Sequence, residues 1–258
     1  MDVFEAIVSH RRSGRPFVLA TIIKTHGSSP RAVGARMLVF ADGTITGTIG
    51  GGRFEKLVID DCLAMHAGGS GNLFKRYRFT QNGADAIGMQ CGGEAELFME
   101  LFDSPNRLVV FGAGHVGRQI VQLVQGLDFS VMVVDDRMNL LADLGPEVST
   151  VLTDAGYEKD LPPVDEKSYV VVVSRSHQCD RAILLHAIDK NCAYIGVIGS
   201  KAKIAKHLDY LKSQGVGEDA LKRLSAPIGL DIKAEGPREI AIAIVAQLVA
   251  VKNRTQID

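Results

Sequence analysis

Three glycines in the tract GAGHVG have the spacing needed to hold a phosphate. They are Gly112, Gly114 and Gly117, and they stand between the apolar run 108–111 and a segment of helical pattern. In such a strand–turn–helix the first glycine allows the tight turn, the second lets the backbone approach a pyrophosphate, and the third lets the helix pack against the strand. The free N–H groups at the start of the helix then favour a phosphate. The tract predicts a nucleotide-binding cleft; the alternative is a tight turn that binds nothing.

Two further side chains belong to this predicted cleft. His115 stands inside the glycine tract, so its ring would face whatever the cleft holds. Asp135 ends the next apolar run, 18 residues after Gly117. In dinucleotide-binding folds an acidic side chain at about this place accepts hydrogen bonds from a ribose diol. We therefore expect both residues to contribute to cofactor binding.

A second group of reactive side chains lies in the tract SRSHQCD, which follows the apolar segment YVVVVS. His177 and Asp180 would stand beyond the carboxyl end of a buried strand. Open α/β sheets bind their ligands at that edge, so these two residues are candidate catalytic groups. The alternative is that the histidine is an ordinary surface or core group.

Cys91 is the cysteine whose surroundings favour chemistry. It lies in the tract GMQCGGEAE, where the flanking glycines would let another molecule approach the thiol. A thiolate is both a nucleophile and a soft metal ligand, so Cys91 is a candidate catalytic and metal-binding residue; the alternative is a structural cysteine in a turn. The other cysteines fall on predicted helix or strand faces and resemble small core residues. They are Cys62, Cys179 and Cys192, and no CxxC pair occurs.

Two loops in the first half of the chain form another candidate anion site. The tract HGSSPR contains Ser28 and Ser29, and the tract TIGGGRFE contains Gly50, Gly51 and Gly52. Hydroxyl groups and glycine backbone N–H groups could bind a phosphate, with Arg31 or Arg53 supplying charge. Neither loop has the P-loop pattern, and glycine runs also serve sharp strand-to-helix turns.

The elements that position these residues divide at Ser104-Pro105-Asn106. After this point strands and helices alternate, as a parallel α/β sheet requires. The expected strands lie near 107–111, 130–134, 148–152, 169–174 and 193–198, and the expected helices near 115–126, 137–144, 179–190, 200–213, 218–223 and 236–252. We therefore predict an α/β protein whose residues 105–258 form a Rossmann-like, doubly wound parallel sheet.

Residues 1–104 are expected to form a smaller α+β domain. An apolar stripe at helical spacing covers residues 2–12, and residues 17–25 read as a buried strand. The Asp-Gly pair at 42–43 predicts a hairpin between 35–40 and 44–50. A helix over 54–67 and strands over 73–79 and 94–102 complete this domain.

Composition excludes several classes of protein. The formal net charge is −1 and tryptophan is absent. Because no basic stripe alternates with aromatic residues, nucleic-acid binding is not expected. The longest apolar segment, 240–251, is interrupted by Gln247 and is too short to span a bilayer. The N-terminus lacks the apolar region of a signal peptide. We expect a cytoplasmic protein that does not enter a membrane.

Taken together, six tracts resemble the XdhC/CoxI family of molybdenum-hydroxylase maturation factors. They are GSSPRAVGARMLV, GTIGGGRFE, GMQCGGEAELFME, LVVFGAGHVG with VVDDR, YIGVIGSKAK, and APIGLDIKAEGPREIAIAI. They occur in the family's order and cover residues from about 2 to 252. Single tracts are weakly diagnostic, whereas six in order are specific.

The resemblance implies a carrier that binds the molybdenum cofactor, brings it to a cysteine desulfurase for sulfuration and delivers it to an apo molybdenum hydroxylase such as xanthine dehydrogenase. By the same resemblance, Cys91 is the thiol near molybdenum or the one that handles sulfur, and Gly112, Gly114 and Gly117 hold phosphate. Two departures matter. Where many members have Thr-His-x-His-x-x-Asp, this chain has SRSHQCD, which keeps only His177 and Asp180. Gln247 also stands where an acidic residue is common in the family.

Other functions stay open at this stage. The glycine tract and Asp135 also suit an NAD(P)-dependent oxidoreductase, or a sensor that binds a dinucleotide without turning it over. A xanthine dehydrogenase itself is not expected, because the chain lacks the cysteine sets of iron–sulfur clusters. The apolar last helix could support a homodimer. The residues do not decide which hydroxylase is served, whether the pterin is a mononucleotide or dinucleotide, or whether Cys91 binds molybdenum or carries a persulfide.

Overall fold

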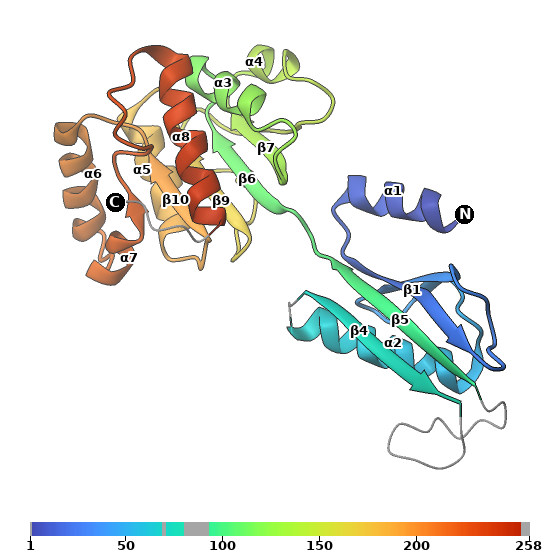
Figure 1. Ribbon diagram of the computed structural model, residues 1–258. Coiled ribbons are helices and arrows are strands. Elements are labelled where there is room, and N and C mark those ends of the chain that lie inside the picture. Colours follow the sequence, from blue (N-terminus) through green and yellow to red (C-terminus); the bar gives the residue numbers. More distant parts are fainter. Residues whose placement is uncertain (1, 69–70, 80–92, 254–258) are drawn as a thin grey trace. The chain divides into compact units, whose positions relative to one another are not determined.

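The chain folds into two compact units, Met1–Ser104 and Pro105–Asp258 (Figure 1). The computed structural model describes residues 2–68, 71–79 and 93–253. Within these residues, no helix is both long and apolar enough to cross a membrane. Each unit has its own sheet and its own hydrophobic core.

The N-terminal unit is built on an antiparallel sheet in the order β3-β2-β1-β5-β4. Its elements are α1 (Val3–Ser13), β1 (Phe17–His26), β2 (Arg36–Phe40), β3 (Ile45–Gly47), α2 (Gly52–Gly68), β4 (Asn72–Arg78) and β5 (Glu94–Phe102). β1 is central and pairs with β2 and β5. Alternate residues of β1 face opposite sides of the sheet: Val18 and Ala20 pack with α2, whereas Phe17 and Leu19 pack with α1.

The C-terminal unit contains a parallel sheet in the order β11-β10-β9-β6-β7-β8. Its elements are β6 (Asn106–Phe111), α3 (His115–Leu123), β7 (Phe129–Asp135), α4 (Met138–Ala142), β8 (Ser149–Leu152), β9 (Ser168–Val172), α5 (His177–Ile188), β10 (Tyr194–Val197), α6 (Lys201–Ser213), α7 (Glu218–Lys222), β11 (Leu224–Ser225) and α8 (Gly236–Lys252). Numbered within this unit the order is 6-5-4-1-2-3, which is that of a Rossmann fold. The predicted fold class is confirmed.

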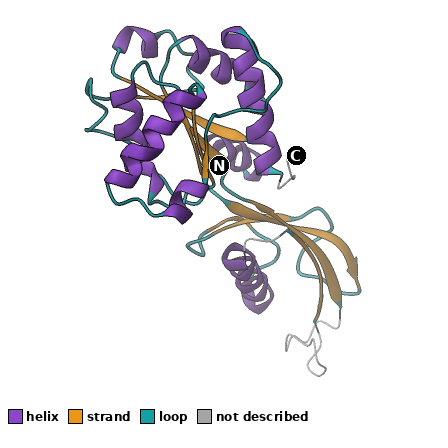
Figure 2. Cartoon of the chain, turned by 90° about the vertical axis from the view of Figure 1, so that its left-hand side faces the viewer, coloured by secondary structure: helices purple, strands orange, loops and turns teal. Residues whose placement is uncertain are grey.

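Helices cover both faces of this sheet, as Figure 2 shows. Leu108 and Val110 of β6 belong to a core shared with α3 and α8, whereas Val109 and Phe111 belong to a core shared with α5 and α6. The apolar run 108–111 therefore has no polar position, because both of its faces are buried.

Two strands differ from the sequence-based expectation. β3 ends at Gly47, where the backbone has a φ of +85° and a Cβ atom would lie 2.6 Å from the Arg36 carbonyl oxygen. The turn at this glycine shortens the strand predicted over 44–50. β11 was not predicted, because its two residues are too few to show a periodic pattern.

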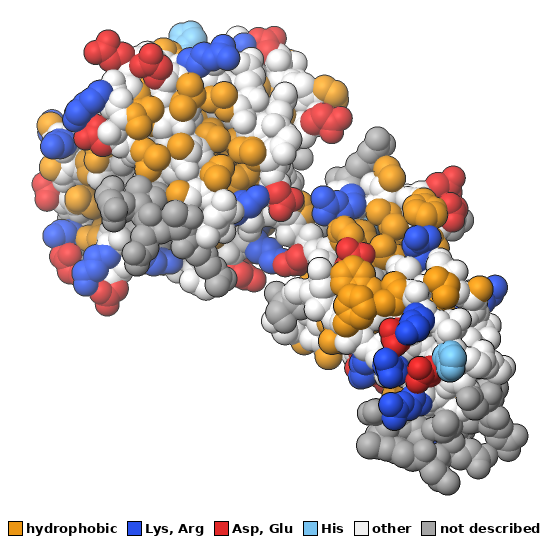
Figure 3. Space-filling view, in the orientation of Figure 1, with side chains coloured by type: hydrophobic (Ala, Val, Ile, Leu, Met, Phe, Trp, Pro, Cys, Tyr) orange, Lys and Arg blue, Asp and Glu red, His pale blue; other side chains and the backbone are white. Residues whose placement is uncertain are grey.

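Hydrophobic side chains also reach the surface of both units, as seen on the face shown in Figure 3. The N-terminal unit exposes Phe4 on α1 and Phe74 on β4. In the C-terminal unit, α8 buries one face, which includes Ile244 and Leu248, and exposes Ile242.

Candidate functional site

In the turn after β6, close packing of the backbone requires glycine at two of the three positions of the glycine motif. Gly112 has a φ of +120°, and a Cβ atom there would lie 2.5 Å from the carbonyl oxygen of Val173, just past β9. A Cβ atom on Gly117 would lie 1.9 Å from the carbonyl oxygen of Gly112. These two glycines therefore let β6, β9 and the start of α3 come close together.

Gly114 differs, because the space beside it is open. A Cβ atom there would have no neighbour within 4 Å. Gly114 is the N-cap residue of α3, and no side chain caps the helix. His115, the first helical residue, is exposed. The turn lies between β6 and β9, where the sheet order reverses, so the free N–H groups of α3 stand at the place where Rossmann folds bind phosphates.

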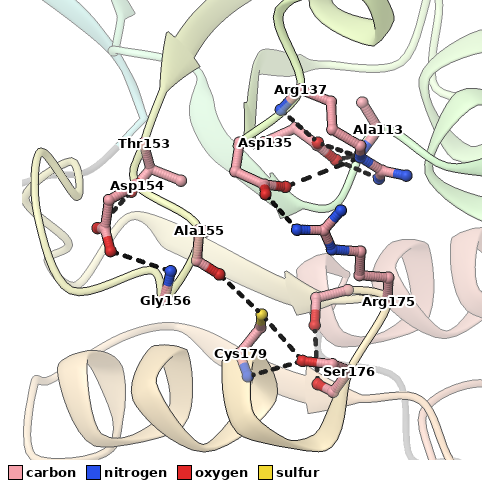
Figure 4. Close-up of polar contacts among 12 residues, drawn as sticks. Ala113, Asp135, Arg137, Thr153, Asp154, Ala155, Gly156, Arg175, Ser176 and Cys179 are labelled. Atoms are coloured by element: carbon pink, nitrogen blue, oxygen red, sulfur yellow. Dashed lines mark hydrogen bonds and ion pairs between the residues drawn. The ribbon is translucent and has the colours of Figure 1, made fainter.

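Asp135 is fully buried at the end of β7 and its carboxylate is already engaged (Figure 4). It accepts hydrogen bonds from the Ala113 backbone N–H at 2.6 Å and from Nε and Nη2 of Arg137, both at 2.8 Å. Burial alone would raise the pKa of Asp135, but these hydrogen bonds outweigh it and lower the pKa. A ribose could reach this carboxylate only by displacing Arg137.

Arginine side chains gather beside Asp135. Arg137 lies 3.7 Å from a carboxylate oxygen of Asp136, and Arg175 forms an ion pair with the same carboxylate. Arg175 follows β9 and Asp136 follows β7, so this pair spans the carboxyl edge of the sheet. Arg175 is nearly half exposed, so part of its guanidinium is open to solvent beside this ion pair.

A second cluster unites His177 and Asp180 with a residue that the sequence analysis missed, His207. One ligand-type atom from each of the three lies within 4.8 Å of the others. His207 Nε2 is 3.5 Å from Asp180 Oδ2, and Lys203 Nζ lies 2.6 Å from that same oxygen. Burial, with the positive charge of Lys203, outweighs the attraction of Asp180 and lowers the pKa of His207. The imidazole is therefore neutral near pH 7.

Two helix starts bring this cluster together. The Ser176 hydroxyl accepts the Cys179 backbone N–H at 3.2 Å and caps α5, which places His177 and Asp180 on its first turn. α6 begins after β10 and carries Lys203 and His207 one turn apart. The sequence contained one signal: His207 occupies a position of the apolar stripe that also includes Ile204 and Leu211.

The structure also joins the two glycine- and serine-containing loops of the N-terminal unit. A Cβ atom on Gly50 would lie 2.4 Å from Cβ of Pro30, next to Ser29. The Glu55 carboxylate, however, accepts the N–H groups of Ile49 at 3.1 Å and Gly51 at 3.2 Å. Burial alone would raise the pKa of Glu55. The hydrogen bonds from these N–H groups and from the Thr48 side chain outweigh burial and lower the pKa. A phosphate here would have to displace an ionised carboxylate.

The remaining loop residues keep open surroundings. Gly51 and Gly52 have φ values of +75° and +66°, a Cβ atom on either would have no neighbour within 4 Å, and Ser28 is exposed. A Cβ atom on Gly93, by contrast, would lie 2.1 Å from the Ser28 carbonyl oxygen. Gly93 follows Cys91 by two positions, while Cys91 itself lies outside the described residues.

Cys62 and Cys179 are buried, as the sequence analysis expected of core residues. Burial raises the pKa of Cys62 to about 12, so this thiol is not reactive. Cys179 donates to the Ala155 carbonyl oxygen at 3.4 Å. Cys192 is partly buried, and burial raises the pKa of its thiol as well.

Fold and site together define a Rossmann-type protein with an open glycine turn at its switch point. The chain belongs to the XdhC/CoxI family. Residues 108–248 match the XdhC Rossmann domain, and residues 10–78 match the XdhC and CoxI family.

Several curated proteins and solved structures resemble the chain. It is 37% identical to the uncharacterized protein YqeB of Escherichia coli (strain K12), over 98% of this chain and 47% of YqeB. It is 29% identical to a probable xanthine dehydrogenase subunit of Bacillus subtilis (strain 168), over 62% of this chain and 47% of that protein. The chain thus spans about half the length of these two relatives.

Two further matches cover most of this chain and most of the protein that it matches. The molybdenum cofactor insertion chaperone PaoD of Escherichia coli (strain K12) is 22% identical, over 95% of this chain and 86% of PaoD. A crystal structure described as a xanthine dehydrogenase from Bacillus halodurans has a TM-score of 0.52 and 22% identity, covering 99% of this chain and 97% of the other. The likeness to this crystal structure shows a similar fold and nothing more.

Proposed function

We propose that this protein is a maturation factor that binds the molybdenum cofactor as cargo and delivers it to an apo molybdenum hydroxylase such as xanthine dehydrogenase. The observation that carries the proposal is the family match across both units, at residues 10–78 and 108–248. The named relatives support it, since PaoD is a cofactor insertion chaperone and another relative is a probable xanthine dehydrogenase subunit.

The glycine turn at the switch point has the chemistry for a phosphorylated pterin. Gly114 leaves its backbone open to a ligand, and the uncapped start of α3 offers N–H groups and a partial positive charge. The exposed guanidinium of Arg175 adds a cation at the same edge of the sheet. In the proposal, these groups hold the phosphate of the cofactor, whether it is a mononucleotide or a dinucleotide form.

The engaged carboxylate of Asp135 counts against a dinucleotide that would use this residue to bind its ribose. A dinucleotide that uses this residue for its ribose needs a free carboxylate, whereas Asp135 is fully buried between Ala113 and Arg137. An NAD(P)-dependent oxidoreductase or a dinucleotide sensor is therefore the second candidate, and a binding assay separates it from the first.

In the same proposal, the Cys91 thiol stands near molybdenum or handles sulfur that a cysteine desulfurase supplies. Its support is the tract GMQCGGEAE and the low reactivity that burial gives Cys62. We expect Cys91→Ala to fold normally and to lose activation of the partner hydroxylase. Cys62→Ala is the matched control. Full activation by the Cys91 variant would remove this thiol from the mechanism.

The decisive measurement is an anaerobic titration of the full chain with molybdenum cofactor, run beside NAD(H) under identical conditions. We expect cofactor binding near one equivalent, weakened by Gly114→Ala and by Cys91→Ala. Binding of NAD(H) alone would replace the carrier with the oxidoreductase or sensor. Sedimentation of the same samples tests the proposed homodimer, for which Ile242 on α8 offers an exposed apolar contact.

A further inference from the structure

Three metal-ligand side chains converge between α5 and α6. His177 and Asp180 come from the first turn of α5, and His207 comes from the second turn of α6. Their nearest ligand-type atoms all lie within 4.8 Å of one another. Two imidazoles and one carboxylate at this separation form a donor set that divalent transition metals prefer.

The state of His207 points to a ligand that completes this cluster. The side chain is fully buried, and neither ring nitrogen has a hydrogen-bond partner among the described residues. Its Nε2 atom lies 3.5 Å from Asp180 Oδ2, which is too long for a good hydrogen bond. A buried polar group without a partner costs free energy. A cation between the imidazole and the carboxylate would remove that cost.

We propose that His177, Asp180 and His207 bind a divalent transition-metal ion of the Zn²⁺ type. His207 contributes Nε2, which faces Asp180, and His177 contributes its ring from the exposed side of the cluster. Three protein ligands leave a coordination position open. His177 also lines a pocket with Gln178, Arg181 and Tyr210, so a small oxygen-donor ligand could approach the cluster from the side of His177.

The neighbours of Asp180 support this role. The Ser174 hydroxyl donates to Asp180 Oδ1 at 2.6 Å, which fixes the carboxylate and directs Oδ2 toward His207. Such an outer contact is typical of ligating carboxylates. Lys203 Nζ lies 2.6 Å from Oδ2, and its positive charge balances the negative charge of the carboxylate. The metal and the Lys203 ammonium compete for this oxygen, which gives the proposal a distinctive consequence.

The experiment titrates the chelator-treated full chain with Zn²⁺ against a chromophoric chelator and then with Co²⁺, whose visible spectrum reports its ligands. We expect one equivalent to bind, with at least about tenfold weaker affinity in His177→Ala. Because His177 is exposed, this variant should fold. Lys203→Met removes the competing cation and should bind Zn²⁺ more tightly. His26→Ala, which removes an exposed histidine of the N-terminal unit, should bind as the unaltered protein does.

Two results would overturn the proposal. One is that Zn²⁺ does not bind to the unaltered protein, or that it binds equally well to the His177→Ala and His26→Ala variants. The other is a thiolate-to-cobalt charge-transfer band, which would place the metal on a cysteine. Neither readout requires molybdenum cofactor, so this test and the test of the carrier function can fail independently.

Discussion

At the scale of single residues, the glycines of the GAGHVG tract have separate tasks. Gly112 and Gly117 make room for neighbouring backbone, since a Cβ atom would lie 2.5 Å from Val173 and 1.9 Å from Gly112 respectively. A Cβ atom on Gly114 would meet nothing within 4 Å, so only a ligand would require the absence of a side chain there. We therefore expect stability and the proposed binding to depend on different glycines of one motif.

Alanine substitution should separate these tasks. Gly112→Ala forces a Cβ atom into the Val173 carbonyl at a positive φ, and we expect a loss of roughly 3 kcal/mol of stability. Gly114→Ala should change stability by less than about 1 kcal/mol while weakening binding of a phosphate-bearing ligand. Urea denaturation and the cofactor titration measure the two effects. Equal destabilisation by both changes would contradict the assignment.

The buried Asp135–Arg137 pair makes stability depend on pH. Hydrogen bonding lowers the pKa of Asp135 below its unfolded value, which is about 3.9. The pair's contribution is therefore complete above about pH 4 and is lost as pH falls through the lowered pKa of the folded state. We expect Asp135→Asn to cost about 2–3 kcal/mol at pH 7 and to flatten the acid limb of the stability curve. Denaturant titrations from pH 2 to 7 measure this. If the pair were unimportant, the Asp135→Asn variant would lose stability at acid pH in the same way as the unaltered protein.

At the scale of elements, α8 is anchored by the one amide in its apolar stretch. Gln247 Oε1 accepts hydrogen bonds from the Tyr194 hydroxyl of β10 at 2.5 Å and from the Gly229 N–H at 2.8 Å. These two hydrogen bonds fix α8 to strand β10 and to the loop that precedes α8. This explains why an otherwise apolar segment contains a polar residue.

Replacing Gln247 tests this anchor. Gln247→Leu leaves two partly buried donors without this acceptor, and we expect a loss of about 2 kcal/mol. Gln247→Glu keeps an acceptor oxygen and should retain most of the stability at neutral pH. Thermal unfolding of the three proteins gives the ranking. If the leucine variant were as stable as the unaltered protein, the amide would have no anchoring role.

The elements themselves were largely predictable, and the contacts between them were not. The strands 107–111 and 169–174 could be recognised because burial on both faces leaves almost no polar position. The partnership of His177 with His207 could not, since the two are separated by 30 residues and meet only through the packing of α5 on α6. The partner of Asp135 was also missed: the sequence pattern predicts a ribose, whereas the folded chain supplies Arg137, two residues further along.

At the scale of the whole molecule, each unit has a complete hydrophobic core. The core of the N-terminal unit includes Leu97, and that of the C-terminal unit includes Leu184, both without exposed surface. Among the residues that the structure describes, neither of these two clusters draws a member from the other unit. The two units are therefore expected to unfold in separate transitions.

Two matched core substitutions test this independence. Leu97→Ala and Leu184→Ala should each cost about 2–5 kcal/mol in the unit that contains them. For a unit of this size, that loss corresponds to a decrease in Tm of roughly 10 °C or more. Calorimetry of the full chain should show Leu97→Ala lowering one transition and Leu184→Ala lowering the other, because each cavity weakens only its own core. A single transition that both changes lower equally would mean that the units unfold as one cooperative body.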